Sequence, residues 1–184
     1  CSSDLKSAAP RDTIAIDAEV GELPDHIQVV MPDIDISTYS FFPVTDYCIT
    51  VRGTIGIECP CFGIRTFTAG TGRYSGLGFT DDSRTVDEYI DKMSRIQEFP
   101  ALTDEETSLA RKHAYALFEL RPLHFTTCEI APVEGKKGVF EQDAIIRVSS
   151  PEDLTHAEDL NAFCEWVLES REEDYLHEVS SPFD

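Results

Sequence analysis

Two short apolar segments, residues 46–51 and 64–69, most strongly limit what this chain can fold into. The first is β-branched and apolar with no turn-forming residue inside it, which is typical of a strand buried on both faces of a parallel sheet. The second has the pattern of another strand. Between them, residues 52–58 form a glycine-rich turn that runs into an apolar stretch, and Phe62-Gly63 closes it. We therefore predict a compact strand–helix–strand unit over residues 46–69.

The rest of the chain alternates between extended and helical patterns. An apolar run predicts a short buried strand over residues 26–31, and a short helix or turn is expected over residues 37–42. The spacing of apolar residues then becomes that of amphipathic helices, first over residues 85–99 and again over residues 103–120. The second of these helices starts with the sequence pattern of a capping box.

Further strands and a helix complete the chain. Residues 123–148 have the pattern of short strands around a turn at Gly135–Gly138, and a last helix is predicted from Ser150. The fold class is therefore α/β, a Rossmann-like parallel sheet with flanking helices. We expect one such domain over residues 6–150, followed by a C-terminal helix and an acidic tail over residues 151–184.

Composition excludes several classes of protein. Of the 184 residues, 35 are acidic and 15 are basic, which gives a formal charge of −20, and 41% are hydrophobic. That hydrophobic share can build a core, so disorder of most of the chain is excluded. No segment approaches the ~18 consecutive apolar residues of a membrane span. The basic residues form no cluster beyond Lys136-Lys137, which argues against a nucleic-acid partner.

The first five residues do not resemble a natural beginning. Cys1 to Leu5 read Cys-Ser-Ser-Asp-Leu, which resembles the translation of the end of a common sequencing adapter. We therefore expect residues 1–5 to be an artefact and the natural chain to be the C-terminal part of a longer protein. A genuine flexible N-terminus is the alternative.

The cysteines and paired aspartates give no sign of a metal centre. With Cys1 set aside, five cysteines remain, and their odd number and irregular spacing favour reduced thiols. Cys59-Pro60-Cys61 lacks a second Cys/His pair at ligand spacing, so no zinc site is expected. Asp81-Asp82 is expected to cap a helix or to lie in a solvated turn rather than to hold a metal.

The turn after the first predicted strand is the most informative segment. A Gly-Thr turn from a parallel strand into a helix leaves backbone N–H groups pointing outward, which suits an anion. Gly53 lets a phosphate approach closely, and the Thr54 hydroxyl can add a hydrogen bond. Glu58 lies four residues later on the same helical face, where a carboxylate suits the hydroxyls of a ribose. A purely structural turn with a solvated Glu58 is the alternative, because short glycine motifs are weak signals.

A second glycine-rich loop, residues 70–78, follows the second predicted strand directly. Arg52 adjoins the first turn and Arg73 lies in this loop, so two cations stand beside two glycine-rich segments in a chain of charge −20. Ligands of open α/β sheets bind at the carboxyl ends of the strands, where both loops are expected. A diphosphate is a ligand that both arginines could neutralise.

Residues 46–58, 63–64 and 68–80 together resemble the C-terminal half of bacterial capsule polysaccharide biosynthesis proteins. These proteins are similar to GT-B glycosyltransferases, some of which transfer Kdo from a CMP-activated donor. The likeness extends through the helix that ends at residues 118–122 and covers roughly residues 25–122. It implies the nucleotide-sugar-binding half of a GT-B-type architecture with two domains, the N-terminal partner domain being absent from this chain.

The resemblance also implies a donor site. Gly53 and Thr54 would meet the donor phosphate, with Arg52 beside them, and Glu58 would meet the ribose or the sugar. The other residues that would line the cleft are Gly70, Gly72, Arg73 and Tyr74. Two features depart from the family pattern: Pro60 interrupts the short helix, and the His-Pro pair expected at an upstream strand end is absent.

The implied activity is transfer of a sugar from a nucleotide-activated donor to a glycan or lipid-linked acceptor. CMP-Kdo is one candidate donor, and no metal or other cofactor is expected. The catalytic residues are not identified, and the chain alone is expected to be inactive.

We expect a cytoplasmic protein, in peripheral contact with the inner face of the membrane. A nucleotide-sugar epimerase of similar architecture and a non-catalytic sugar-binding domain in polysaccharide assembly or export are the alternatives. No Ser/His/Asp spacing indicates a hydrolase, and His113 is expected to pack against the core.

Overall fold

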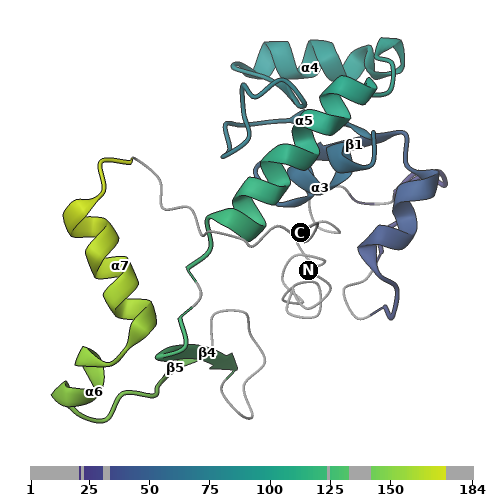
Figure 1. Cartoon of the computed structure of the whole chain (residues 1–184). Coiled ribbons are helices and arrows are strands. Elements are labelled where there is room, and N and C mark those ends of the chain that lie inside the picture. Colours follow the sequence, from purple (N-terminus) through teal and green to yellow (C-terminus); the bar gives the residue numbers. More distant parts are fainter. Residues whose placement is uncertain (1–20, 22, 31–33, 124, 133–141, 173–184) are drawn as a thin grey trace. The chain divides into compact units, whose positions relative to one another are not determined.

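The computed structural model describes residues 21, 23–30, 34–123, 125–132 and 142–172 (Figure 1). The chain forms two compact units, one built mainly on residues 41–123 and the other mainly on residues 124–170. The sequence analysis placed the division after residue 150. In the structure it falls earlier, and the two strands before residue 150 belong to the same unit as the C-terminal helices.

The unit over residues 41–123 contains a three-stranded parallel sheet in the order β1-β2-β3. Its strands are β1 (Tyr47–Thr50), β2 (Arg65–Thr68) and β3 (Asp81–Asp82). Helix α3 (Ile55–Cys61) connects the first two strands, and Cys48 pairs in register with Thr66. The predicted strand–helix–strand unit is confirmed, and the fold is of the α/β class.

Strand β1 lies at an edge of this sheet, which explains one difference from the sequence analysis. We expected a strand buried on both faces, yet the Ile49 side chain is 53% exposed. Strand β2 is the central strand, and its Thr66, Phe67 and Thr68 are all buried. The expected burial on both faces was therefore wrong for β1, and the buried strand is the central one, β2.

Helices precede and follow the sheet strands in sequence. They are the 3₁₀-helix η1 (Thr38–Val44), α4 (Val86–Ser94), the 3₁₀ turn η2 (Ile96–Glu98), α5 (Asp104–Tyr115) and the π-helical turn η3 (Ala116–Leu120). The two longer ones, α4 and α5, start where the sequence predicts. The Thr85 hydroxyl accepts a hydrogen bond from the Glu88 N–H, and Thr103 forms a complete capping box with Glu106.

Two apolar segments lie at the surface instead of in a core. The segment 26–30 contains no strand and Val30 is 51% exposed, so the buried strand predicted over residues 26–31 was wrong, and Met31 lies outside the described residues. On α4, Ile90 is 58% exposed. Apolar periodicity marks a face of an element, but only neighbouring elements can bury that face.

Helix α3 supplies side chains to both hydrophobic clusters of this unit. The first cluster contains Ile57, Tyr74, Phe79 and Ala110. The second cluster contains Phe42, Cys59 and Ile64. Because Ala110 belongs to α5 and Phe42 to η1, α3 packs against both of those elements. It is therefore held on two sides although it has only seven residues.

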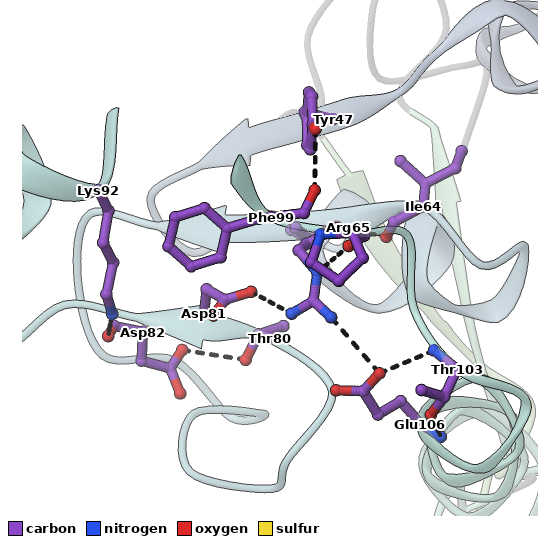
Figure 2. A network of polar contacts seen from close by, with 12 residues as sticks. Tyr47, Ile64, Arg65, Thr80, Asp81, Asp82, Lys92, Phe99, Thr103 and Glu106 are labelled. Carbon is purple, nitrogen blue, oxygen red and sulfur yellow. Dashed lines mark hydrogen bonds and ion pairs between the residues drawn. The ribbon is translucent and has the colours of Figure 1, made fainter. Parts of the chain in front are cut away.

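Arg65, at the start of β2, joins strand β3 and helix α5 through polar contacts (Figure 2). Its Nη1 lies 2.7 Å from Asp81 Oδ2 on β3, and its Nη2 lies 3.5 Å from Glu106 Oε2 on α5. Its Nε donates a hydrogen bond to the carbonyl oxygen of Pro100. The arginine side chain is only 12% exposed. Buried, multiply bonded guanidinium groups of this kind fix the positions of the elements around them.

The other unit contains two antiparallel strands and two helices. They are β4 (Cys128–Pro132), β5 (Gln142–Ile146), α6 (Pro151–Thr155) and α7 (Glu158–Glu169). The predicted short strands are confirmed. The turn predicted at Gly135–Gly138 lies outside the described residues.

The single C-terminal helix that the sequence predicts is in fact two, broken at residues 156–157. Two side chains account for the break. The Asn161 Nδ2 donates to the carbonyl oxygen of Thr155 at 2.9 Å and so satisfies a group at the end of α6. Asp159 accepts hydrogen bonds from the N–H of Thr127 at 2.9 Å and from its hydroxyl at 2.8 Å. The start of α7 is therefore held against the segment before β4.

The cysteines within the described ranges are free thiols: Cys48, Cys59, Cys61, Cys128 and Cys164. No helix in the described part of the chain is both long and apolar enough to cross a bilayer. Among the same residues, no group of three or more His, Cys, Asp or Glu side chains is placed to hold a metal ion.

Candidate functional site

The carboxyl ends of β1 and β2 lie side by side because these strands are parallel neighbours. Their last register pair is Thr50 with Thr68, and the N–H of Ala69 donates to the carbonyl oxygen of Thr50 at 3.0 Å. The two glycine-rich segments, residues 52–58 and 70–78, therefore leave the sheet at the same edge, the one formed by the carboxyl ends of its strands. In α/β sheets this is the edge where ligands bind, so we take it as the candidate site.

Gly53 and Thr54 form the turn into α3. The Gly53 N–H donates to the Thr50 hydroxyl oxygen at 3.3 Å, and its carbonyl oxygen accepts from the Gly56 N–H at 3.0 Å. A Cβ at Gly53 would lie 3.2 Å from the Thr50 hydroxyl oxygen, so the tight turn favours glycine. The Thr54 carbonyl accepts from the Glu58 N–H at 3.1 Å, which places these two residues one helical turn apart, as their spacing predicts.

The helix that follows this turn is short. It has seven residues, and Pro60 lies buried in its last turn without ending it before Cys61. The Thr54 side chain makes no capping hydrogen bond to the helix. A helix of this length has a weak macrodipole. Positive charge at the site must therefore come mainly from side chains, not from the helix end.

The second loop is closed by its own polar side chains. The Ser75 hydroxyl oxygen accepts from the Gly72 N–H at 2.7 Å, and Asp82 Oδ2 accepts from the Gly76 N–H at 2.6 Å. Gly76 has a φ of +77°, which L side chains rarely adopt. At this position glycine is required by the path of the loop itself.

Tyr74 connects the two loops from inside the protein. It is 1% exposed, and its hydroxyl donates to the carbonyl oxygen of Gly53 at 3.0 Å. The ring fills the space beside Gly56, where an added Cβ would lie 2.3 Å from the tyrosine oxygen. Burial is the main cause that raises the pKa of Tyr74. The resemblance implied that Tyr74 lines the cleft, but this residue lies in the core and positions the Gly53 turn.

Two other glycines of the second loop fit closely against neighbouring residues. A Cβ at Gly70 would lie 3.4 Å from Val51 Cγ1, and a Cβ at Gly72 would lie 3.4 Å from Tyr74 Cζ. Both glycines are partly buried. Their small size therefore lets the two loops pack together, which is a structural role.

Asp82 is a residue of this edge that the sequence analysis did not assign to the site. Its Oδ1 accepts from the hydroxyls of Thr68 at 2.8 Å and Thr80 at 3.0 Å, and with the Gly76 N–H the carboxylate has three donors (Figure 2 shows the contact with Thr80). Asp81 pairs with Arg65. The expectation of a helix cap or a solvated turn was therefore wrong, because both carboxylates hold the sheet and its loop together.

Arg52 and Arg73 are exposed, one on each loop. Within the described part of the chain neither arginine forms an ion pair, in contrast to Arg65, which contacts two carboxylates. An arginine without a carboxylate partner in a strongly acidic chain keeps its charge available for an anionic ligand.

His113, on α5, packs as the sequence analysis expected. It is partly buried, and its ring centroid lies 5.5 Å from that of Phe79. Its Nε2 is buried and has no hydrogen-bond partner among the described residues. Burial first, and then the positive charges of Arg121 and Arg73, lower the pKa of His113. The neutral form of the imidazole is therefore favoured, and the charge of Arg73 acts on this side chain of α5.

Comparison with family models, with curated proteins and with solved structures finds no match to this chain. What bears on its function is therefore the arrangement of its own residues. Seven of the eight residues assigned to the site are at least partly exposed along this edge: Arg52, Gly53, Thr54, Glu58, Gly70, Gly72 and Arg73. The eighth is the buried Tyr74. Two guanidinium groups suit an anion, and a carboxylate on the following helix can accept hydrogen bonds from hydroxyls.

Proposed function

We propose that this chain provides the donor-binding half of a GT-B-type glycosyltransferase that acts in capsule or surface polysaccharide biosynthesis. The ligand is a nucleotide-activated sugar. One observation carries the proposal: two glycine-rich loops meet at the carboxyl edge of neighbouring parallel strands, each with an exposed arginine. Nucleotide-binding α/β folds hold their ligands at this edge.

The charge distribution supports an anionic ligand. The chain has a formal charge of −20. Arg52 and Arg73 form no ion pair among the described residues, whereas Arg95 and Arg147 each pair with a carboxylate. The phosphate of a nucleotide would supply the missing negative charge.

The chemistry proposed for this edge needs no proton transfer from these residues. As the glycosidic bond to the donor phosphate breaks, negative charge grows on the leaving nucleotide, and the guanidinium groups of Arg52 and Arg73 would stabilise it. The Thr54 hydroxyl would donate a hydrogen bond to the donor phosphate. Glu58, one helical turn further on, would accept hydrogen bonds from the ribose hydroxyls. None of these residues is assigned as the general base.

Binding of CMP to the Glu58→Ala variant tests the role of the carboxylate. We expect CMP affinity, measured by isothermal titration calorimetry, to fall at least about tenfold, because the ribose loses a charged acceptor. Glu105→Ala is the matched control, since Glu105 is an exposed glutamate on α5. Unchanged affinity in Glu58→Ala would overturn the assignment of Glu58.

Product analysis separates the transferase from the related functions. An epimerase of similar architecture would change the configuration of a nucleotide sugar with no acceptor present. A non-catalytic sugar-binding domain would bind the donor and leave it intact even with an acceptor and the complete protein. Transfer of the sugar to an acceptor by the complete protein is the outcome that we propose.

A further inference from the structure

Two cysteines, one on β1 and one on α3, pack in the same hydrophobic cluster. Cys48 lies on β1 and packs against the hydrophobic cluster of Phe42, Cys59 and Ile64. Cys59, on α3, is a buried member of that cluster, so the two cysteines pack together in one cluster although they belong to different elements. A short chain segment that includes the Gly53 turn connects them.

The contact makes the two thiols chemically different. The hydrogen bond from Cys59 is the main cause that lowers the pKa of Cys48, while burial and the charge of Glu58 oppose it. The same hydrogen bond, with burial, raises the pKa of Cys59. Cys48 is thus the sulfur that more readily becomes a thiolate, which is the form that attacks an oxidant.

The geometry also favours bond formation between these sulfurs. A disulfide needs sulfur atoms about 2.05 Å apart, and two cysteines that pack in one cluster on neighbouring elements can reach this distance by side-chain rotation. Cys59 is 2% exposed, whereas Cys48 is partly exposed on the edge strand. Phe42 and Ile64 of the same cluster also line an open depression of about 500 Å³.

Cys61 is the third thiol of the region, and it is oriented differently. Two residues along a helix correspond to a rotation of about 200°, so Cys61 leaves α3 on the side opposite Cys59. It packs against the other cluster, which contains Ile57, Tyr74, Phe79 and Ala110. Burial raises its pKa. Cys61 is therefore both misplaced for Cys48 and less reactive.

We propose that Cys48 and Cys59 are a site of reversible oxidation by peroxides. The Cys48 thiolate attacks one oxygen of hydrogen peroxide, the O–O bond breaks, and a sulfenic acid and water form. The Cys59 sulfur then attacks the Cys48 sulfur, its proton leaves with the hydroxyl as a second water, and the S–S bond closes. Two thiols are oxidised by two electrons in total, and one peroxide is reduced to two waters. This inference does not rest on donor binding.

The disulfide would close a loop that contains the Gly53 turn and would fix β1 to α3. Closing a loop lowers the entropy of the unfolded chain, so the oxidised protein should melt at a higher temperature than the reduced protein. A dithiol reductant should reverse both the bond and the shift in melting temperature.

Peptide mapping of the peroxide-treated chain tests the proposal directly. Trypsin cleaves after Arg52 and Arg65, which separates the peptide that contains Cys48 from the peptide that contains Cys59 and Cys61. We expect a disulfide-linked pair of these peptides whose mass is lower than their sum by two hydrogen atoms. Fragmentation before Pro60 then distinguishes Cys59 from Cys61, because the proline lies between them.

Variants complete the test. Cys61→Ser should still form the linked pair, whereas Cys59→Ser should instead accumulate a sulfenic acid on Cys48 that a dimedone probe traps. A linkage through Cys61, or oxidation of all thiols to sulfinic acids at equal rates without a linked peptide, would overturn the proposal. Because the mapping of the unsubstituted chain already decides between these outcomes, a variant that fails to fold does not remove the test.

Discussion

The hydroxyl of Tyr74 donates a hydrogen bond to the carbonyl oxygen of Gly53 at 3.0 Å, and this contact connects the two loops at the carboxyl edge of β1 and β2. The ring can reach that carbonyl because Gly56 has no side chain. Gly53 lies in the turn into helix α3, so one buried tyrosine helps to fix where the first loop lies relative to the second. The proposed ligand would bind to loops whose separation is already set.

Replacement of Gly56 by alanine tests this packing. Alanine ordinarily stabilises a helix by about 1 kcal/mol relative to glycine. Here the added Cβ would lie 2.3 Å from the Tyr74 oxygen, so we expect Gly56→Ala to lower the free energy of unfolding by about 1–3 kcal/mol in urea denaturation. In a Tyr74→Ala background the same change should become neutral or stabilising. A destabilisation of equal size in both backgrounds would show that the tyrosine is not its cause.

Replacement of Arg65 by lysine tests the network in Figure 2. Lysine keeps the charge but cannot make the three separate contacts of the guanidinium group with Asp81, Glu106 and Pro100. We expect the free energy of unfolding to fall by about 1–3 kcal/mol. Arg147→Lys is the control, because the pair with Glu129 is exposed and such pairs contribute at most about 1 kcal/mol. Equal effects of the two changes would contradict the role given to Arg65.

Asp159 should make the stability of the chain depend on pH. Hydrogen bonds from Thr127 lower the pKa of this carboxyl in the folded protein, and the bond from the Thr127 N–H is the largest cause. Because the pKa of Asp159 is lower in the folded protein, the ionised carboxylate stabilises the fold at pH values above its unfolded pKa near 3.8. This stabilisation is lost as the pH falls toward the folded pKa. We therefore expect Asp159→Asn to melt at a lower temperature than the unsubstituted chain at pH 7.

Comparing Asp159→Asn with the unsubstituted chain in acid separates the effect of the Asp159 carboxylate from that of the other carboxylates. Thermal melts followed by circular dichroism at about pH 7 and about pH 2 should show the difference between Asp159→Asn and the unsubstituted chain shrinking as the pH falls. A difference that stays constant over this range would mean that the asparagine acts through its shape rather than through its charge.

Local signals in the sequence were sufficient to predict part of this fold. The β-branched runs around residues 47–50 and 65–68 predicted β1 and β2, and Thr103 with Glu106 predicted the start of α5, because strand preference and capping depend on nearby residues. The same signals placed Gly53 and Arg73 on neighbouring loops, since parallel strands end at a common edge.

What could not be predicted depends on contacts between residues far apart in the sequence. The burial of Tyr74 follows from its hydrogen bond to Gly53 and from the gap beside Gly56, neither of which has a local pattern. The break between α6 and α7 likewise depends on Asp159 accepting hydrogen bonds from Thr127, a residue before β4. Periodicity alone cannot reveal such partners.

Titration of CMP into the chain and into the Arg52→Ala/Arg73→Ala double variant tests the central claim most directly. We expect calorimetry to show saturable binding that weakens at least about tenfold in the double variant and at raised salt, because both guanidinium groups contact phosphate. Arg84→Ala, which removes another exposed arginine of the same unit, should bind CMP as the unsubstituted chain does. The account is contradicted if the chain binds no CMP, or if it binds CMP equally well with and without the two arginines.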